Sequence, residues 1–205
     1  MLTYILIGIT CLVSIISFEN KNLYRLLMFN PYLVDSNRQW HRFLTHVLVH
    51  ANWPHLIFNM ISLYSLGTFV EAYFKITFGE TKGSILFVTL YVLSAIMSSV
   101  YSFEKHKHNP SYNAVGASGA VCAVIFSGIL LSPTLPMSMM FLPQMPGFIF
   151  GTLFLVVSWY LAKKGEGNIG HDAHFWGAVF GFIFPICVQR ELFTDFIQQI
   201  QQYFY

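Results

Sequence analysis

The chain has 205 residues, of which 55% are hydrophobic and only 10% are charged, and its formal net charge is +2. An ordinary soluble domain has about 25% charged residues and cannot hide this much apolar surface, so lipid is the expected solvent for much of the chain. The small net charge, without a basic stripe, argues against nucleic-acid binding.

Six apolar segments, separated by polar or turn-rich stretches, predict an all-α polytopic membrane protein with six transmembrane helices in one domain, residues 1–205. The first segment has no basic region before it and no small-residue cleavage site after it, so we expect a retained membrane helix. The expected helices are residues 2–18, 54–74, 84–101, 117–131, 148–162 and 173–188.

The fourth segment is short for a membrane span. Its roughly 15 residues reach about 22 Å as a helix, whereas the hydrocarbon core is about 30 Å thick. One end of this helix is therefore expected to lie below the membrane surface. Such a position suits a group that water must reach within the bilayer.

Polar residues gather at the starts of the second, fourth and sixth segments, which even numbers of crossings place on one face of the membrane. His55 and Asn59 open the second segment, Ser118 opens the fourth and His174 opens the sixth. Polar groups at one level of a membrane bundle are costly unless they find partners or water, so they are candidates for function.

Ser118 has surroundings that suit a nucleophile. Gly116 and Gly119 allow a substrate backbone to approach, and the start of a helix leaves a positively polarised N–H group to stabilise an oxyanion. His174 is the candidate base for the serine hydroxyl. Asp172 lies about 200° around the helix from His174, so we predict a serine–histidine dyad without a carboxylate. A lone serine in a membrane helix more often bonds its own backbone, so this motif gains weight only in combination.

Two spacings support the same interpretation. His55 and Asn59 are four residues apart, so both face one way and can donate to one oxyanion. His174, Gly177 and Gly181 share a helix face, on which the glycines would let the sixth helix press against the fourth.

We expect no metal and no cofactor. His46 and His50 lie one turn apart, but the chain has no HExxH motif and no acid beside them, so we expect them to hold the first loop together by hydrogen bonds. The three cysteines are expected to be buried free thiols: Cys11, Cys122 and Cys187.

Charges and aromatics give two expectations about the membrane surface. The first, third and fifth loops carry eight Lys and Arg residues against three on the opposite side, which by the positive-inside rule places the odd loops in the cytoplasm. The aromatic-rich end, residues 198–205, is expected to be an interfacial tail.

Taken together, the motifs resemble those of the rhomboid family of intramembrane serine proteases, from about Trp40 to Gly181. Arg42 and the residues that follow it resemble the segment around the family's tryptophan–arginine motif, and Gly67 and Glu71 match its Gly-x-x-x-Glu pattern. The remaining motifs are His55-Leu-Ile-Phe-Asn59, Gly116-Ala-Ser118-Gly119 and Ala173-His174-Phe-Trp-Gly177-Ala-Val-Phe-Gly181.

The resemblance implies that Ser118 is the nucleophile, that His174 is the general base, and that His55, Asn59 and the Ser118 amide form the oxyanion hole. It implies single-span membrane protein substrates, no cofactor, and a bacterial cytoplasmic membrane with the active site on the extracytoplasmic side. This orientation opposes the charge count. We follow the resemblance, because arginines in a partly embedded first loop need not act as translocation signals.

Two positions depart from the family pattern. Trp40 and Arg42 are separated by one residue, whereas the family has them adjacent. Cys122 stands where many bacterial members have a tyrosine that packs on the catalytic imidazole, so we expect another contact at His174, such as an aromatic of the sixth segment, or a looser ring. The alternative function is a non-proteolytic relative that binds membrane helices. A small transporter is disfavoured because no repeated halves are visible.

Overall fold

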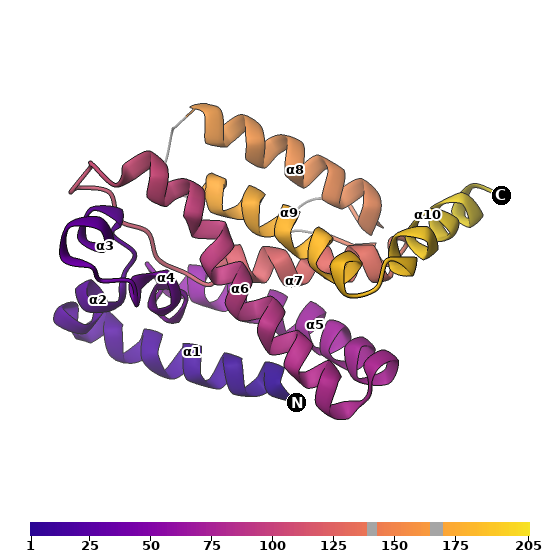
Figure 1. Cartoon of the computed structure of the whole chain (residues 1–205), viewed down its shortest axis with the longest axis horizontal. Helices are drawn as coiled ribbons and strands as arrows, with labels where there is room; N and C mark the ends of the chain where they lie inside the picture. The colour runs from indigo at the N-terminus through magenta and orange to yellow at the C-terminus, as the bar shows by residue number, and fades with distance from the viewer. Residues whose placement is uncertain (139–142, 165–169) are drawn as a thin grey trace.

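The computed structural model describes residues 1–138, 143–164 and 170–205, and shows a helical bundle (Figure 1). The expected segments form α1 (Leu2–Glu19), α5 (Trp53–Phe78), α6 (Glu80–His106), α7 (Ser118–Leu131), α8 (Gly147–Lys164) and α9 (His171–Val188). The first loop contains α2 (Lys21–Leu27), α3 (Pro31–Asn37), α4 (Arg42–Thr45) and the 3-10 helix η1 (His46–Leu48), and α10 (Glu191–Phe204) follows α9. Strand β1 (Pro136–Met137) pairs antiparallel with β2 (Met145–Pro146).

The expected all-α membrane bundle is confirmed, whereas the expected number of six spans is only partly met. Among the described residues, α1, α5, α6 and α8 are long and apolar enough to cross a membrane. Helix α9 passes the same test only together with α10, across a bend of 114°, and α7 is a shorter apolar helix. Length and composition therefore support four or five spans, and six crossings stay a prediction.

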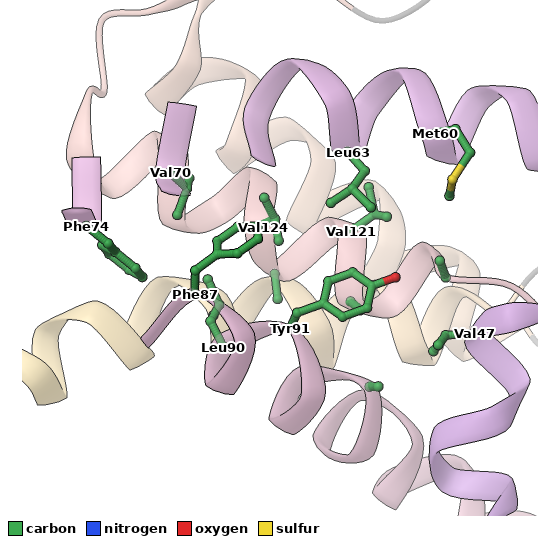
Figure 2. Close-up of a cluster of buried hydrophobic side chains, with 14 of the residues drawn as sticks. Val47, Met60, Leu63, Val70, Phe74, Phe87, Leu90, Tyr91, Val121 and Val124 are labelled. Carbon is green, nitrogen blue, oxygen red and sulfur yellow. The ribbon is translucent and has the colours of Figure 1, made fainter. Parts of the chain in front are cut away.

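Helix α7 occupies the centre of the bundle, which explains why it is apolar on all sides. Only Ser118 and Ile125 of α7 escape full burial, and α5, α6 and α9 pack around it. A helix that is hydrophobic all round is stable only when it is enclosed in this way. Figure 2 shows part of this core, in which Val121 and Val124 of α7 lie among side chains of α5 and α6 (Leu63, Val70, Phe74, Phe87, Leu90 and Tyr91).

Helices α7 and α9 approach so closely that their backbones touch. A Cβ atom at Gly181 would overlap the backbone of Ala123, and one at Gly177 would overlap the backbone of Gly119. The hydroxyl of Ser127 donates to the Gly181 carbonyl at 2.7 Å. The structure thus brings α9 against α7 at these glycines, as their spacing predicts.

Glu71 fastens α1 to α5. Its buried carboxylate accepts hydrogen bonds from the backbone N–H groups of Leu2 (2.8 Å) and Thr3 (2.9 Å) and from the Thr3 hydroxyl (2.7 Å), and it pairs with Lys75 at 3.0 Å. The first N–H groups of a helix have no partner within it, and a negative charge is favourable there. Gly67 lets α1 come this close, because a Cβ atom at Gly67 would lie 3.0 Å from Cγ2 of Thr3.

Arg42 is buried in the first loop, where it binds the end of α2. Its Nη1 donates to the carbonyls of Arg25, at 2.9 Å, and Met28, and its Nε donates to Oε1 of Gln39 at 2.7 Å. The last carbonyls of a helix lack partners within it, and a guanidinium offers several donors in a fixed geometry. Arg42 therefore makes the first loop a folded unit.

Two buried histidines join the first loop to its neighbours. Nδ1 of His46 lies 2.9 Å from the Arg42 carbonyl, and Nδ1 of His50 lies 2.9 Å from Oγ of Ser14 on α1. The prediction that these rings hold the loop by hydrogen bonds is confirmed. Burial lowers the pKa of His46 to about 4 and the pKa of His50 to about 3, so both rings are neutral in the folded protein at neutral pH.

Changing Gly181 to alanine should push α9 away from α7, because the added Cβ meets backbone atoms of Ala123 that cannot move aside alone. Overpacking of this kind costs about 1–3 kcal/mol. Thermal unfolding in detergent measures the loss. Gly8→Ala is the matched control, because nothing lies within 4 Å of a Cβ atom at Gly8; equal stability of the two variants would contradict the account.

Acid should destabilise the fold through His46 and His50. In the unfolded chain a histidine binds a proton below about pH 6.5, whereas these folded rings resist protonation until about pH 4 and 3. Their contribution to stability is therefore complete above about pH 6.5 and falls with pH, by about 1.4 kcal/mol per pH unit for each ring.

The measurement is the free energy of unfolding between about pH 7 and about pH 4. His50→Gln keeps an acceptor but does not titrate, so its stability should fall less steeply than that of the wild type. His108→Gln, a change at an exposed position, is the control. Identical slopes for His50→Gln and the wild type would show that His50 does not contribute.

Candidate active site

Ser118 is the first residue of α7 and is half-buried. The regular helix begins directly there, since the N–H of Val121 donates to the carbonyl of Ala117 at 2.8 Å. The N–H of Ser118 is among the first of the helix, for which the helix itself supplies no acceptor. The hydroxyl and a positively polarised N–H therefore belong to the same residue.

Gly116 brings the start of α5 to the segment that precedes Ser118. Its φ is 111°, a backbone conformation that side-chain-bearing residues rarely adopt. A Cβ atom at Gly116 would lie 2.5 Å from Cε1 and 2.8 Å from Nε2 of His55. Only glycine leaves room for this ring. The imidazole of His55 therefore lies against Gly116, the residue two positions before Ser118.

Asn59 lies one turn after His55 and is buried, with 3% of its surface exposed. Its Nδ2 donates to the His55 carbonyl at 2.8 Å. A side-chain amide has two N–H donors, so this bond orients the group and leaves one donor for a further acceptor. The start of α5 is itself fixed by Asn52, whose Oδ1 accepts a hydrogen bond from the His55 N–H at 2.9 Å.

His174 is near the start of α9, which lies beside the start of α7. A Cβ atom at Gly119 would lie 3.4 Å from the carbonyl oxygen of Ala173, so the residue after Ser118 lies against the residue before His174. The structure thus brings together the starts of α5, α7 and α9, the three helices that carry the residues nominated from the sequence. A direct bond between the serine hydroxyl and the imidazole belongs to the proposal made below.

The ring of His174 packs between two other rings. The centroid of Phe154, on α8, lies 6.3 Å away with the planes at 35°, and the centroid of His171 lies 6.0 Å away edge-on. Neither ring comes from the predicted sixth segment, residues 173–188: among the described residues, Phe154 belongs to α8, and His171 precedes that segment as the first residue of α9. Cys122 lies buried in the neighbouring cluster with Phe150.

The expectation of three buried thiols holds for Cys122 but is wrong for Cys187, which is exposed, and for Cys11, which is half-buried.

The segment before Ser118 is fastened to the first loop through its backbone. The N–H of Gly116 donates to the His46 carbonyl at 3.0 Å, and the N–H of Ala117 donates to Nε2 of His50 at 3.3 Å. Because Nε2 accepts, the proton of the neutral His50 ring is on Nδ1, which faces the Ser14 hydroxyl. The sequence indicated that His50 holds the loop but gave no sign of this bond.

A second set of hydrogen bonds joins the first loop to the third loop, a few residues before Gly116. The N–H groups of Phe29 and Ala114 each donate to the other's carbonyl at 2.9 Å. The Nδ2 of Asn30 donates to the carbonyl of Pro110 at 3.2 Å and to Oδ1 of Asn113 at 3.0 Å. The first and third loops therefore form one support for the start of α7.

Two contacts at the end of α6 were not foreseen. Asp172 pairs with Lys105 at 3.0 Å, which ties the end of α6 to the start of α9. Trp40, one residue away from its family position, lies with its ring centroid 6.0 Å from Phe103 and 6.2 Å from Phe43. The ion pair joins residues 67 positions apart, and the contacts of Trp40 depend on ring packing. Neither kind of contact produces a recognisable local sequence pattern.

The arrangement supplies the parts of a serine hydrolase without an added group. It has a hydroxyl at a helix start, an imidazole on the adjoining helix, and a second imidazole with an amide donor on a third helix. Helix dipole and donors favour a developing negative charge at this point. Within the described ranges, no group of three or more His, Cys, Asp or Glu residues is placed to hold a metal ion.

Comparisons with known proteins agree with this architecture. The sequence model of the rhomboid domain matches residues 37–191. The chain is 32% identical to the rhomboid protease GluP of Bacillus subtilis over 148 residues, and 27% identical to the rhomboid protease GlpG of Haemophilus influenzae over 168 residues. It is also 27% identical over 170 residues to RHOMBOID-like protein 12, mitochondrial, of Arabidopsis thaliana.

These matches cover 70%, 82% and 74% of the chain in the same order. The chain spans 25% of the length of GluP and 48% of the Arabidopsis protein, but 79% of GlpG. Since the domain match takes in most of the chain, together with the starts of α5, α7 and α9, the protein is an integral multi-pass membrane protein that belongs to the rhomboid family.

Proposed function

We propose that this protein is an intramembrane serine endopeptidase that hydrolyses peptide bonds in the transmembrane segments of membrane proteins. The observation that carries the proposal is the packing of the segment Gly116–Gly119. His55 lies against Gly116, and Ala173, the residue before His174, lies against Gly119. The names of the relatives as rhomboid proteases support the same activity.

In this proposal Ser118 and His174 form a catalytic dyad. His174 removes the proton of the serine hydroxyl as the oxygen attacks the carbonyl carbon of the substrate, and it then returns this proton to the leaving amine. Water attacks the acyl-enzyme with His174 again as base. Phe154 and His171 would restrict the ring through packing. Asp172 is engaged by Lys105, which fits a dyad without a carboxylate.

The oxyanion of the tetrahedral intermediate would be bound by three donors: the Ser118 N–H, the His55 ring and the free N–H of Asn59. Each is held in advance, by the helix start, by Gly116 and by the His55 carbonyl respectively. Donors that need no rearrangement as charge develops contribute most to lowering the barrier.

The substrates we propose are single-span membrane proteins, reached from the bilayer. We further propose a bacterial cytoplasmic membrane with the active site on the extracytoplasmic side, as the family resemblance implies. The chemistry uses only protein groups and water, so no cofactor and no metal is needed.

The first prediction concerns the dyad itself. Ser118→Ala and His174→Ala should each abolish cleavage of a model single-span substrate in liposomes, since loss of either partner in a soluble serine protease costs about 10⁶-fold in kcat. Ser36→Ala, at an exposed position of α3, is the control and should cut normally. If Ser118→Ala cuts like the wild type, the proposed nucleophile is wrong. If the wild type binds substrate but never cuts it, the non-proteolytic alternative gains.

The second prediction concerns Asn59. Asn59→Ala should lower kcat by about 10²–10³-fold with little change in KM, because its hydrogen bond strengthens only as the oxyanion forms. Steady-state kinetics on the same substrate gives both constants. Asn37→Ala, at an exposed position of α3, serves as control. An unchanged kcat would remove Asn59 from the oxyanion hole.

A further inference from the structure

Helix α10 leaves the bundle at the end opposite the candidate active site (Figure 1). His174 lies at the start of α9, and α10 follows the end of α9 after a bend of 114°. The 18 residues of α9 correspond to about 27 Å, close to the roughly 30 Å of a hydrocarbon core. In the six-crossing arrangement predicted from the sequence, α9 runs across the bilayer; the bend would then fall near the far surface, and α10 would run closer to parallel than to perpendicular with that surface.

One face of α10 packs on the protein. Leu192 is 3% exposed, and the ring of Phe196 lies 5.2 Å from the ring of Phe182 on α9. The ring of Tyr203 lies 5.8 Å from the ring of Phe148 at the start of α8. These contacts fix the rotation of α10 about its own axis.

A second, polar face lies on another side of the helix. Its edge borders a hollow of about 280 Å³ beneath the end of α7, and Gln199 donates to the Leu131 carbonyl there at 3.4 Å. Polar side chains occupy a continuous arc of the helix by their spacing: Glu191, Thr194, Asp195, Gln198, Gln201 and Gln202.

The third face is apolar and exposed. Phe193, Ile197, Ile200 and Phe204 follow one another at intervals of four, three and four residues, so they form one strip along the helix. Phe193 is 45% exposed, Ile197 40% and Phe204 67%, whereas Ile200 is half-buried. A helix that only packed on the bundle would need one apolar face, whereas α10 has a second one beside it.

We propose that this strip lies among the lipid chains of the leaflet opposite the active site, so that α10 is an interfacial membrane helix. The strip continues the bilayer-facing surface of the bundle. The ring of Phe204 lies 6.0 Å from that of Phe148, and the residues that follow Phe148 on α8 present exposed apolar side chains, among them Ile149, Leu153 and Val156.

The charge of α10 indicates which lipids it meets. The helix contains two acids and no Lys or Arg, although Arg190 directly precedes it, so we do not expect attraction to anionic headgroups to be the driving interaction. Burial of apolar side chains between lipid chains is the driving interaction. A bilayer of zwitterionic lipids is therefore sufficient to bind α10. Of the three faces, the first meets the protein, the apolar strip meets lipid and the polar face meets water. This inference does not depend on catalysis by Ser118.

The test uses the full chain in phosphatidylcholine liposomes, with a photoreactive phenylalanine analogue placed at one position at a time. Illumination of proteins labelled at Phe193 or Ile197 should yield lipid adducts in mass spectrometry, several-fold more than labelling at Gln198 or Gln201, the matched positions on the polar face. Addition of anionic lipid should leave this ratio unchanged.

Each other outcome overturns the proposal. Crosslinked dimers from Phe193 or Ile197 would show that a second copy covers the strip. Equal lipid adducts from the apolar and polar positions, or none from any of them, would show that α10 is not seated in this way. Thermal unfolding of every labelled protein shows whether it is folded, and cleavage activity is measured separately, so failure of the proposed protease leaves this test intact.

Discussion

The backbone contact between α7 and α9 is the constraint on which the candidate site depends. Gly177 and Gly181 let α9 approach until side-chain-bearing residues would collide with the backbone at Gly119 and Ala123. The serine and histidine project from the starts of these two helices, so their separation is set by this contact rather than by the side chains themselves. In lipid, where apolar surfaces gain little by meeting one another, such close packing is a main source of helix association.

The position of α7 at the centre of the bundle creates a second requirement. Gly116 and Ala117, the last residues before it, are buried, so bulk water does not satisfy their N–H groups. The first loop supplies acceptors: the carbonyl of His46 for Gly116, and the ring of His50 for Ala117. Arg42 holds that loop in shape by binding the end of α2. The first loop therefore supports Ser118, the proposed nucleophile, rather than merely connecting two spans.

Much of this architecture follows from the sequence, for physical reasons that can be stated. Each apolar segment became a helix because backbone polar groups in lipid must be satisfied internally. The nomination of His55, Asn59, Ser118 and His174 rested on counting crossings, and the starts of their helices do meet. The number of spans was harder to predict. Helix α7 is short and enclosed by other helices, so its length does not show whether it crosses the bilayer.

Other features had no local signal. The contact of Phe154 with His174 joins α8 to α9 by ring packing, and aromatics are too common in this chain to single one out. The bond from Ala117 to His50 joins residues 67 positions apart. The fold of the first loop was also missed, since its short helices are held by single side chains such as Arg42 rather than by a long amphipathic pattern.

We propose that the packing of α5, α7 and α9 makes one hydroxyl, that of Ser118, unusually reactive. The most direct measurement is to treat the membrane-embedded protein with a fluorophosphonate and to locate the adduct by mass spectrometry. We expect a single adduct on Ser118 that disappears in His174→Ala. An intact, folded protein without any adduct, or an adduct on Ser118 that forms equally without His174, would contradict it.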